Sequence, residues 1–561
     1  MIRKEEYEMN LYEKLADLIF PDVHESIDDL EQRYPLRNLP DGAMVTRFAP
    51  SPTGFLHTGS LLTSLIGWKF AQQTNGIFIL RLEDTDQKRE VQGSGKQLVD
   101  QMKEFNVIPS EGYLSGGGYG PYAQSERKSI YRTVIKEMVR RNLAYPCFCT
   151  TQELDALRQE QEASKVVPGY YGIYARDRHL SVEEAIARIE NGAPYVMRFR
   201  SQGNHEQKIV IEDLIRGRLE LAENDQDIVI LKSDGLPTYH FAHLVDDHFM
   251  RTTHVTRGEE WLPSLPLHLE LFAQMGWAKL QYAHLPVMMK LDEGNRRKLS
   301  KRKDPEAAVS YFLEEGYPKE GFLEYLFTIA NSDFEAWRAT HPSDPFSNFS
   351  LTFDKFSRDG ALFDMDKVKF LCKEQLAKRT SEAIVEEILT WANQYEPEFA
   401  KRIIQDKSYF TNIMAIERNQ EKPRKDYACY RDVLPQISFF YEDLFELEVQ
   451  RNGYPFNENF SYPIIASFLQ AYHDHLSLDC DQSSWFQSVR ELGEQHRFCS
   501  NVKQFKKNPE GWLGHVGDVS EMIRIAVCGR RQSPNLYDIQ NVMGIALVKN
   551  RLQKSIAFLL R

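Results

Sequence analysis

Residues 47–60, with the sequence RFAPSPTGFLHTGS, combine the residue types that a phosphate-binding loop requires. Gly54 and Gly59 permit a ligand to approach the backbone closely, and His57 supplies a side-chain donor. A helix is predicted to begin directly after this loop, and the free N–H groups of a first helical turn attract phosphate. For an isolated His-Thr-Gly triplet, an ordinary Pro/Gly turn with a structural histidine is the alternative interpretation.

A second chemical signal is the basic run at residues 296–303, RRKLSKRK, in which six of eight residues are basic and none is acidic. By itself such a run is typical of a solvated face or of a surface that binds polyanions. Positioned lysines can also stabilise the charge that builds on phosphoryl and pyrophosphate oxygens. For that role Lys301 is the first choice and Lys298 the second.

Acidic residues follow the second predicted strand, in the sequence RLEDTD at residues 81–86. Doubly wound folds bind ligands at the carboxyl edge of the sheet, so Glu83 is placed to meet a cationic group of a ligand. For Asp84 and Asp86, helix capping is an alternative role. A further group of polar residues lies in loops or strand ends downstream: Tyr239, His243, Arg257 and Glu260.

The two loops, in this order and about 240 residues apart, resemble the HIGH and KMSKS signatures of class I aminoacyl-tRNA synthetases in their bacterial glutamyl form. The resemblance is dense over residues 44–330, where it includes YAQSERKSIYR at 122–132 and DLIRGR at 213–218. It is sparser afterward, although residues 354–368 and 523–539 still resemble the bacterial anticodon-binding helical domain.

This resemblance implies ATP-dependent ligation of L-glutamate to tRNA(Glu) through a glutamyl-adenylate, with Mg²⁺ accompanying the triphosphate. Whether tRNA(Gln) is also charged depends on anticodon contacts in the least familiar region. A tRNA-modifying glutamyl transferase is one alternative, but such relatives lack a helical C-terminal domain. A catalytically silent tRNA-binding regulator is another, and the intact His57, Glu83, Lys298 and Lys301 argue against it.

The resemblance also implies roles for individual residues. The catalytic group comprises His57, Lys298 and Lys301. The ATP-binding group comprises His57, Gly59, Ser60, Glu260 and Lys301. The glutamate-binding group comprises Arg47, Ala49, Ser51, Glu83, Tyr239, His243 and Arg257. Within it, Arg47 and Tyr239 would face the side-chain carboxylate, which a guanidinium fits as a bidentate fork. Two positions depart from the family pattern, since Ser60 replaces the second histidine of HIGH and His243 replaces a frequent asparagine.

Cys147 and Cys149 invite a zinc interpretation, because closely spaced thiolates can chelate this metal. Some relatives complete such a site with a tyrosine and, four residues later, a cysteine, but the matching positions here are Tyr170 and Tyr174. Two thiolates and phenols are poor ligands for structural zinc, so we expect no bound metal at this site.

The elements that must position these residues form a βαβ unit, with strands at 44–48 and 77–82 and a helix at 60–75. We therefore predict an α/β fold with a doubly wound parallel-sheet, Rossmann-like catalytic domain, an inserted α/β subdomain and an all-α C-terminal anticodon-binding region. The expected boundaries are 1–40 for an N-terminal helical extension, 41–146 and 228–295 for the two halves of the catalytic domain, 147–227 for the inserted acceptor-binding subdomain, 296–345 for the KLSKR loop and stem-contact region, and 346–561 for the anticodon-binding region.

Composition agrees with a multidomain globular protein: 561 residues suggest three or four domains, and 42% are hydrophobic. The formal net charge of −12 excludes a wholesale basic coat for nucleic acid. Residues 401–431 carry eight basic and four acidic residues, which suits an RNA backbone, and a charged helix face is the alternative interpretation. Seven cysteines without a dense framework favour a reducing compartment, so we expect a cytoplasmic monomer with no membrane association. Residues 1–40 hold five basic and ten acidic residues, unlike a basic targeting segment.

Overall fold

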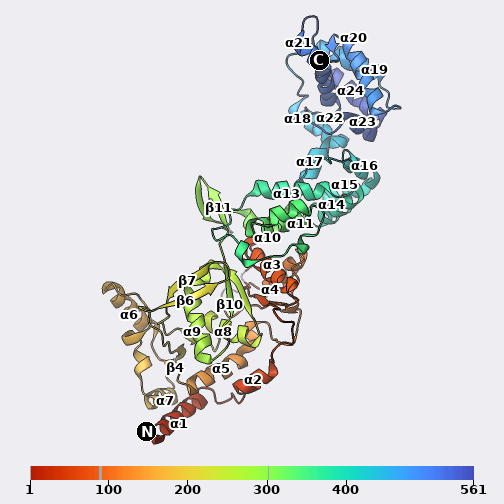
Figure 1. The fold of residues 1–561 in the computed structure, drawn as a ribbon. Helices are drawn as coiled ribbons and strands as arrows, with labels where there is room; N and C mark the ends of the chain where they lie inside the picture. Colours follow the sequence, from red (N-terminus) through yellow and green to blue (C-terminus); the bar gives the residue numbers. More distant parts are fainter. Residues whose placement is uncertain (1, 53, 87–90, 301) are drawn as a thin grey trace. The chain divides into compact units, whose positions relative to one another are not determined.

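The computed structural model describes residues 2–52, 54–86, 91–300 and 302–561. The chain folds as two compact units. Figure 1 draws the ribbon with its colours following the sequence. Unit 1 comprises Met1–Phe312 and Leu323–Asp364, and unit 2 comprises Leu313–Phe322 and Met365–Arg561. The six finer boundaries given above remain a prediction.

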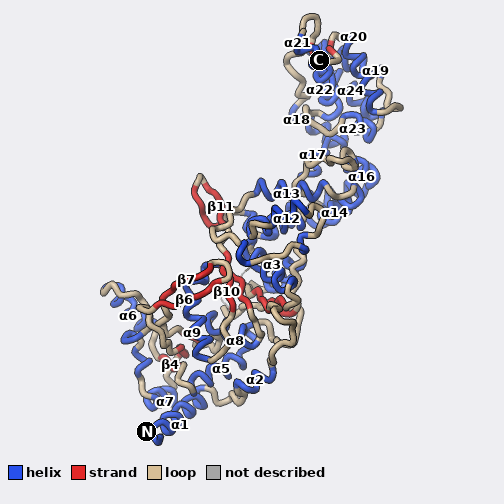
Figure 2. Tube along the Cα trace, in the orientation of Figure 1, coloured by secondary structure: helices blue, strands red, loops and turns tan. Residues whose placement is uncertain are grey.

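Unit 1 contains the predicted parallel sheet. Its strands form a three-stranded part, β1 (Val45–Phe48), β2 (Ile77–Leu80) and β3 (Glu111–Gly112), and a two-stranded part, β9 (His254–Gly258) and β10 (Gln281–Leu285). β2 pairs in parallel with both β1 and β3, and β9 pairs in parallel with β10. The backbone N–H of Thr253, just before β9, donates to the carbonyl of Val45 at 2.9 Å, so β1 lies beside β9. The predicted Rossmann-like class is therefore confirmed (Figure 2).

Helix α3 (Thr58–Gln73) forms the crossover between β1 and β2 that the sequence predicts. Gly67 lets this helix approach the sheet, because a Cβ there would lie 3.1 Å from the Thr256 hydroxyl and 3.4 Å from the Phe78 ring. The hydroxyl of Thr46 donates to the Gly67 carbonyl at 2.8 Å. This close packing fixes the start of α3 near the carboxyl end of β1. Further helices accompany the sheet: α4 (Ser94–Glu104), α5 (Lys128–Arg140), α8 (Tyr239–Phe249) and α9 (Leu265–Met275).

The segment between the two halves of this sheet is mixed, as expected for an insertion. Its elements are β4 (Ala144–Cys147), α6 (Thr151–Ala163), α7 (Val182–Glu190), β5 (Val196–Phe199), β6 (Lys208–Asp213), β7 (Gly217–Ala222) and β8 (Val229–Leu231). β4, β5 and β8 form one antiparallel sheet, and β6 and β7 form a hairpin.

The N-terminal extension is helical, as predicted, and consists of α1 (Ile2–Ile19) and α2 (Ile27–Arg33). Pro21 stands between them, and Leu15, Ala16 and Leu30 are buried in a core shared with α5. The ammonium group of Lys136 donates to the carbonyls of Phe20 and Val23, which satisfies backbone groups at the end of α1.

Unit 1 continues with the hairpin β11 (Met289–Asp292) and β12 (Asn295–Lys298), then α10 (Val309–Glu315), α11 (Lys319–Ala330) and α12 (Phe334–Thr340), of which α10 and α11 extend into unit 2. The aromatic rings of Phe327 in α11, Phe334 in α12 and Phe349 pack together, with centroids 5.1–6.3 Å apart.

Unit 2 is helical almost throughout, as predicted. Its longer helices are α13 (Met365–Ala377), α14 (Ser381–Tyr395), α15 (Pro397–Gln405), α16 (Lys407–Ala415), α18 (Glu442–Asn452), α19 (Tyr462–His475), α20 (Gln482–Gln495), α22 (Val516–Cys528), α23 (Leu536–Met543) and α24 (Ile545–Leu559). They enclose one apolar core from Leu376 to Leu559. Among the described residues, no helix combines the length and apolar character that crossing a bilayer requires.

Candidate active site

A cleft of about 1000 Å³ opens in unit 1 at the carboxyl ends of the parallel strands. Most of the residues predicted to act on substrate line it together: Arg47, Ala49, Ser51, His57, Gly59, Ser60, Glu83, Tyr239, Arg257, Glu260 and Lys298. Lys301, our first choice for stabilising phosphoryl charge, lies outside the described residues. His243 is described but does not line the cleft.

The loop at residues 54–60 ends in a helix start of the kind expected for phosphate. His57 is the N-cap of α3, and its Nδ1 accepts from the Gly59 N–H at 3.0 Å. The Thr58 hydroxyl donates to the Glu306 carbonyl at 2.8 Å, and the Val309 N–H donates to the Leu56 carbonyl at 3.0 Å. These bonds join the first signature loop to the segment that follows the second.

The second signature loop begins at Lys298, the exposed last residue of β12. Asp304 holds the end of this loop: it accepts two hydrogen bonds from Arg297 at 2.6 and 2.8 Å, and one from the Ser300 N–H at 2.9 Å. The Arg297 hydrogen bonds hold the pKa of Asp304 well below its usual range. The anchoring of this loop by Asp304 was not apparent from the sequence.

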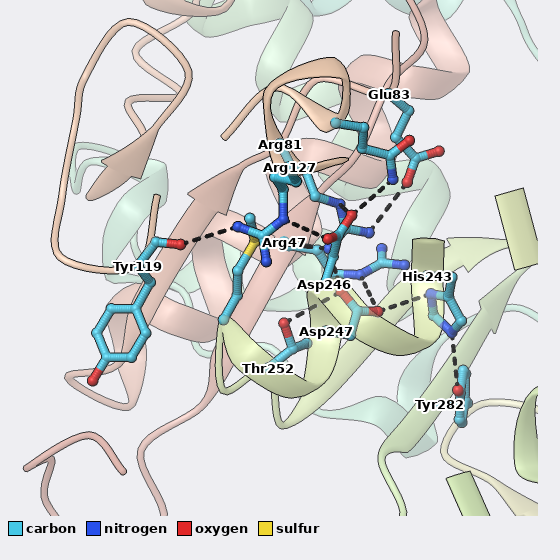
Figure 3. A network of polar contacts seen from close by, with 12 residues as sticks. Arg47, Arg81, Glu83, Tyr119, Arg127, His243, Asp246, Asp247, Thr252 and Tyr282 are labelled. Atoms are coloured by element: carbon cyan, nitrogen blue, oxygen red, sulfur yellow. Dashed lines mark hydrogen bonds and ion pairs between the residues drawn. The ribbon is translucent and has the colours of Figure 1, made fainter. Parts of the chain in front are cut away.

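A network of buried charges lies behind the cleft (Figure 3). Asp247, on α8, accepts from Arg47 at 3.2 Å and from Arg81 at 2.5 Å. Asp246, its neighbour, accepts from Arg127 at 2.6 Å. Three arginines from the first half of the catalytic domain are thus held by two adjacent carboxylates from the second half.

Glu83 completes this network and reaches the cleft. Arg81 donates to its carboxylate at 3.1 Å. Burial raises the pKa of Glu83 to about 7, with Arg81 and Arg47 opposing that rise. Burial acts in the same direction on Asp247, but Arg47 and Arg81 hold its pKa well below the usual range. Asp247 is therefore ionised in the folded protein, whereas Glu83 is partly protonated near pH 7.

His243 lies one layer behind the cleft wall, which differs from its expected place among the glutamate contacts. Its Nδ1 lies 2.9 Å from an oxygen of Asp247, and its Nε2 lies 3.1 Å from the Tyr282 hydroxyl. Burial lowers the pKa of His243 to about 4, so the imidazole is neutral near pH 7. It contacts the carboxylate that holds Arg47, so it acts on the cleft through Asp247.

The residues that line the cleft but were not singled out from the sequence include Trp261, Lys232 and Asp234. The ring of Trp261 stacks on Tyr239 with centroids 4.3 Å apart, and Lys232 donates to the Thr85 carbonyl at 2.9 Å. Asp234 lies 3.3 Å from the Lys232 ammonium group. Lys232 ends the strand-like run IVILK, and its position at a strand end was the available signal. Gly258 leaves room for the carboxylate of Glu260, which would lie 2.1 Å from a Cβ at that glycine.

Cys147 and Cys149 lie next to several polar side chains in the inserted segment. Their sulfurs and an Asp177 oxygen lie within 4.8 Å of one another, and the Tyr170 hydroxyl lies 3.5 and 3.3 Å from the two sulfurs. Hydrogen bonding with Cys149 and Tyr170 lowers the pKa of Cys147 to about 6. Asp177 is a neighbour that the sequence reasoning missed, whereas Tyr174 packs against the ring of Tyr171.

The hydrogen bonds of this cluster are satisfied within the protein. Asp177 accepts from the Phe148 N–H at 2.7 Å and from Arg176 at 3.2 Å. The same Arg176 guanidinium lies 3.3 Å from the sulfur of Cys149, where its positive charge opposes a metal cation. One thiolate, one thiol, one carboxylate and one phenol, with the Arg176 guanidinium beside them, therefore fit zinc poorly here.

In unit 2, the basic segment 401–431 is neutralised by carboxylates. Six of its eight cations form ion pairs: Lys401 with Glu398, Arg402 with Asp443, Lys407 with Glu386, Arg424 with Glu417, Lys425 with Glu374, and Arg431 with Glu396. Arg418 is buried and donates to the Met414 and Leu376 carbonyls. This pattern favours a charged helix face over a surface with cations available for RNA phosphates.

Comparisons with known proteins agree with this geometry. Residues 43–355 match the family model described as tRNA synthetases class I (E and Q), catalytic domain. The chain is 44% identical to a glutamate–tRNA ligase of Acetivibrio thermocellus, over 97% of this chain and 99% of that protein. It is 43% identical to a glutamate–tRNA ligase of Clostridium perfringens strain SM101, over 97% and 100%.

A solved structure extends the similarity to the fold. The crystal structure of a glutamate tRNA ligase from Elizabethkingia meningosepticum, in complex with its amino acid, matches with a TM-score of 0.72 and 30% identity, over 92% of this chain and 100% of that one. A glutamate–tRNA synthetase from Elizabethkingia anophelis matches with a TM-score of 0.71 and 28% identity, over 92% and 99%.

The buried neutral His243 predicts a pH-dependent stability. Its folded-state pKa of about 4 lies below the value of 6.5 expected in the unfolded chain, so protonation favours unfolding. Its contribution is fully present above about pH 6.5 and is lost as the pH falls toward 4, by up to about 3 kcal/mol. We expect His243→Asn to flatten the fall in urea midpoint between pH 7.5 and pH 5. Equal slopes for variant and parent protein would contradict this account.

The satisfied cysteine cluster predicts that zinc is dispensable. We expect purified protein to contain much less than one zinc per chain by plasma mass spectrometry, and chelation with EDTA to leave the thermal midpoint unchanged. The Cys149→Ser variant should show the same metal content as the parent. One equivalent of zinc that disappears in this variant, with a lower midpoint after chelation, would show that Cys147, Cys149 and Asp177 hold a metal.

Proposed function

The chain belongs to the class I tRNA synthetases, in their glutamate–tRNA ligase branch, and from this premise we propose how the residues of its cleft divide the reaction. The enzyme joins L-glutamate to tRNA in an ATP-dependent reaction. In the first step an oxygen of the α-carboxylate attacks the α-phosphorus of ATP, and pyrophosphate leaves. In the second, the terminal ribose hydroxyl of tRNA attacks the acyl carbon, and AMP leaves.

The observation that carries the assignment of roles is the convergence of the first signature loop, Lys298 of the second loop and the charged residues on one cleft. Glutamate brings two carboxylates and one ammonium group. Arg47 and Tyr239 would face its side-chain carboxylate, and Arg257 and Ser51 would help hold the amino acid. Glu83 would meet the ammonium group, whose charge favours the ionised form of a carboxyl with a raised pKa.

ATP would lie against the first signature loop. His57, Gly59 and Ser60 would approach its phosphates at the start of α3, and Glu260 would contact the nucleotide. Lys298 and Lys301 would stabilise the charge on the departing pyrophosphate, where loss of one preorganised donor typically costs about 10²–10³ in rate.

Mg²⁺ would enter with the ATP phosphates. In the described part of the chain, the one cluster of three potential metal ligands is that of Cys147, Cys149 and Asp177, which does not line the cleft. The cleft thus offers no ready cage of carboxylates for a metal alone. This agrees with the preference of Mg²⁺ for nucleotide phosphates, water and one or two carboxylates.

The cellular setting follows from the same function. We propose a cytoplasmic monomer, because translation takes place there and all seven cysteines are free thiols. tRNA(Glu) is the proposed nucleic-acid substrate. Charging of tRNA(Gln) is the alternative substrate scope, and the helical anticodon-binding region of unit 2 would decide it.

Substrate scope is tested by charging assays with purified tRNA(Glu) and tRNA(Gln). We expect radiolabelled glutamate to be transferred to tRNA(Glu) in an ATP-dependent reaction, because the proposed roles give the cleft residues that bind glutamate and residues that bind ATP. Comparable kcat/KM values on the two tRNAs would identify a non-discriminating enzyme. Absence of transfer to tRNA(Glu) would contradict the proposed substrate.

The role of Arg47 predicts selective loss of glutamate activation. Removing one member of a buried charge pair costs about 3–5 kcal/mol, or about two to three and a half decades. Glutamine is neutral at its side chain and gains less from this arginine. Arg47→Ala should therefore depress kcat/KM for glutamate far more than any trace activity with glutamine.

The matched control is Arg251→Ala, which removes an arginine that pairs with Glu31 and does not line the cleft. It should lower the thermal midpoint without changing the ratio of the two amino acids. If Arg47→Ala behaves in the same way, Arg47 serves only to hold Asp247.

A further inference from the structure

Arg257 forms hydrogen bonds with two histidines, His284 and His268, that have no part in the proposed reaction. Its Nε lies 2.9 Å from Nε2 of His284, and its first terminal nitrogen lies 3.2 Å from Nδ1 of His268. Both histidines are fully buried, and Arg257 itself is 4% exposed. An arginine that lines a substrate cleft is thus fixed by neutral rings on the side away from solvent.

The pairing of the parallel strands dictates this arrangement. Arg257 on β9 is the register partner of His284 on β10, so both side chains leave the sheet on the same face. Tyr282, two residues before His284, points to that face as well, and the guanidinium lies 5.0 Å from its ring centroid.

The direction of each hydrogen bond follows from the chemistry of arginine, which can only donate. Nε2 of His284 must therefore be without hydrogen, so its Nδ1 carries the proton and donates to Asp213 at 2.6 Å. By the same argument Nδ1 of His268 accepts, and its Nε2 donates to Nδ1 of His240 at 3.0 Å. Each imidazole has one required tautomer.

Two N–H groups of Arg257 are available to a ligand. One of its five N–H groups goes to His284, one to His268, and one to the Trp261 carbonyl at 3.4 Å. Two remain, and this is the number that a carboxylate accepts in a bidentate pair.

Asp213 is itself rigidly placed, at the first position of the DLIRGR motif, whose chemical role the sequence left open. One oxygen of its carboxylate accepts from the backbone N–H groups of Ile215 at 3.0 Å, Arg216 at 2.8 Å and His284 at 3.3 Å. The other oxygen is the one that accepts from the His284 ring. The two oxygens therefore have separate tasks: one closes the turn after β6, and the other sets the tautomer of His284.

We propose that Asp213 and His284 form a relay of positioning residues for Arg257, with His268 as its second support, and that this relay sets the affinity for the amino-acid carboxylate. The inference rests on the proposed role of Arg257 in holding glutamate. Asp213 fixes the proton on Nδ1 of His284, bare Nε2 fixes the guanidinium, and the guanidinium presents its two remaining N–H groups to the substrate.

The test is the isosteric variant Asp213→Asn. Its amide oxygen can keep the three backbone hydrogen bonds of the turn, while its NH₂ group faces Nδ1 of His284 and forces that nitrogen to accept. The proton then moves to Nε2 and opposes the N–H of Arg257. We expect the dissociation constant for glutamate, measured by titration calorimetry, to rise about 10- to 100-fold, the cost of a small misplacement at a binding group. The dissociation constant for ATP should not change.

A double-mutant cycle separates the relay from a general structural effect. Gln at position 284 can place an amide oxygen near the position of Nε2, but it has no ring proton to offer Asp213. Glutamate affinity of His284→Gln should therefore lie above that of His284→Leu, which has no acceptor. In the His284→Gln background, Asp213→Asn should change glutamate affinity less than about twofold. An equal loss in both backgrounds, or no loss in either, would overturn the relay.

Two further variants complete the design. Asp227→Asn alters another buried carboxylate, which accepts from Tyr145 and Arg178 in the inserted segment, and should leave glutamate affinity unchanged. Arg257→Ala tests the premise: if it binds glutamate normally, the proposed role of Arg257 fails and the relay fails with it. If Arg257→Ala binds weakly while Asp213→Asn binds normally, the relay alone is wrong. Thermal midpoints of all variants show which of them fold.

Discussion

The pairing of Asp246 and Asp247 with three buried arginines is the constraint on which the catalytic domain depends. Buried charges must be paired, because an uncompensated charge costs several kcal/mol. Arg47, Arg81 and Arg127 come from the first half of the domain, and the two aspartates come from α8 in the second half. The inserted segment separates these halves in sequence, so the same ion pairs that satisfy the charges also hold the two halves together.

This network also shapes the cleft, because some of its members belong to both. Asp247 forms an ion pair with Arg47 and also contacts His243. The position of the Arg47 guanidinium in the cleft is therefore fixed by residues that do not line the cleft. Glu83 shares Arg81 with Asp247 and keeps a pKa of about 7. A positively charged ligand group would therefore favour the ionised form of Glu83, while Asp247 keeps its charge.

The sequence predicted the features that depend on local pattern. The βαβ unit followed from breaker and apolar spacing, and the cleft residues followed from two loops at strand ends, Arg47 with the first and Lys298 with the second. The sequence YHFAHLVDD does not reveal which face of α8 meets the cleft, so it did not show that His243 contacts Asp247 and does not line the cleft. The spacing of His243 and Asp247 places them on one face of the helix. Asp177 and Asp304 were missed because their partners are set by tertiary structure. For the same reason, the count of eight basic and four acidic residues over 401–431 did not show that most of these cations pair with carboxylates.

The two arginines proposed to face glutamate are held by different kinds of acceptor, and the difference matters for an anionic substrate. Asp247 is ionised, so part of the positive charge of Arg47 is already balanced before substrate arrives. Arg257 is held by neutral imidazoles, since burial lowers the pKa of both His268 and His284. A neutral acceptor orients a guanidinium without balancing its charge, whereas a carboxylate in the same place would compete with the carboxylate of the substrate. Placing the charge of Asp213 one ring farther away thus fixes the geometry of Arg257 and leaves its positive charge for glutamate.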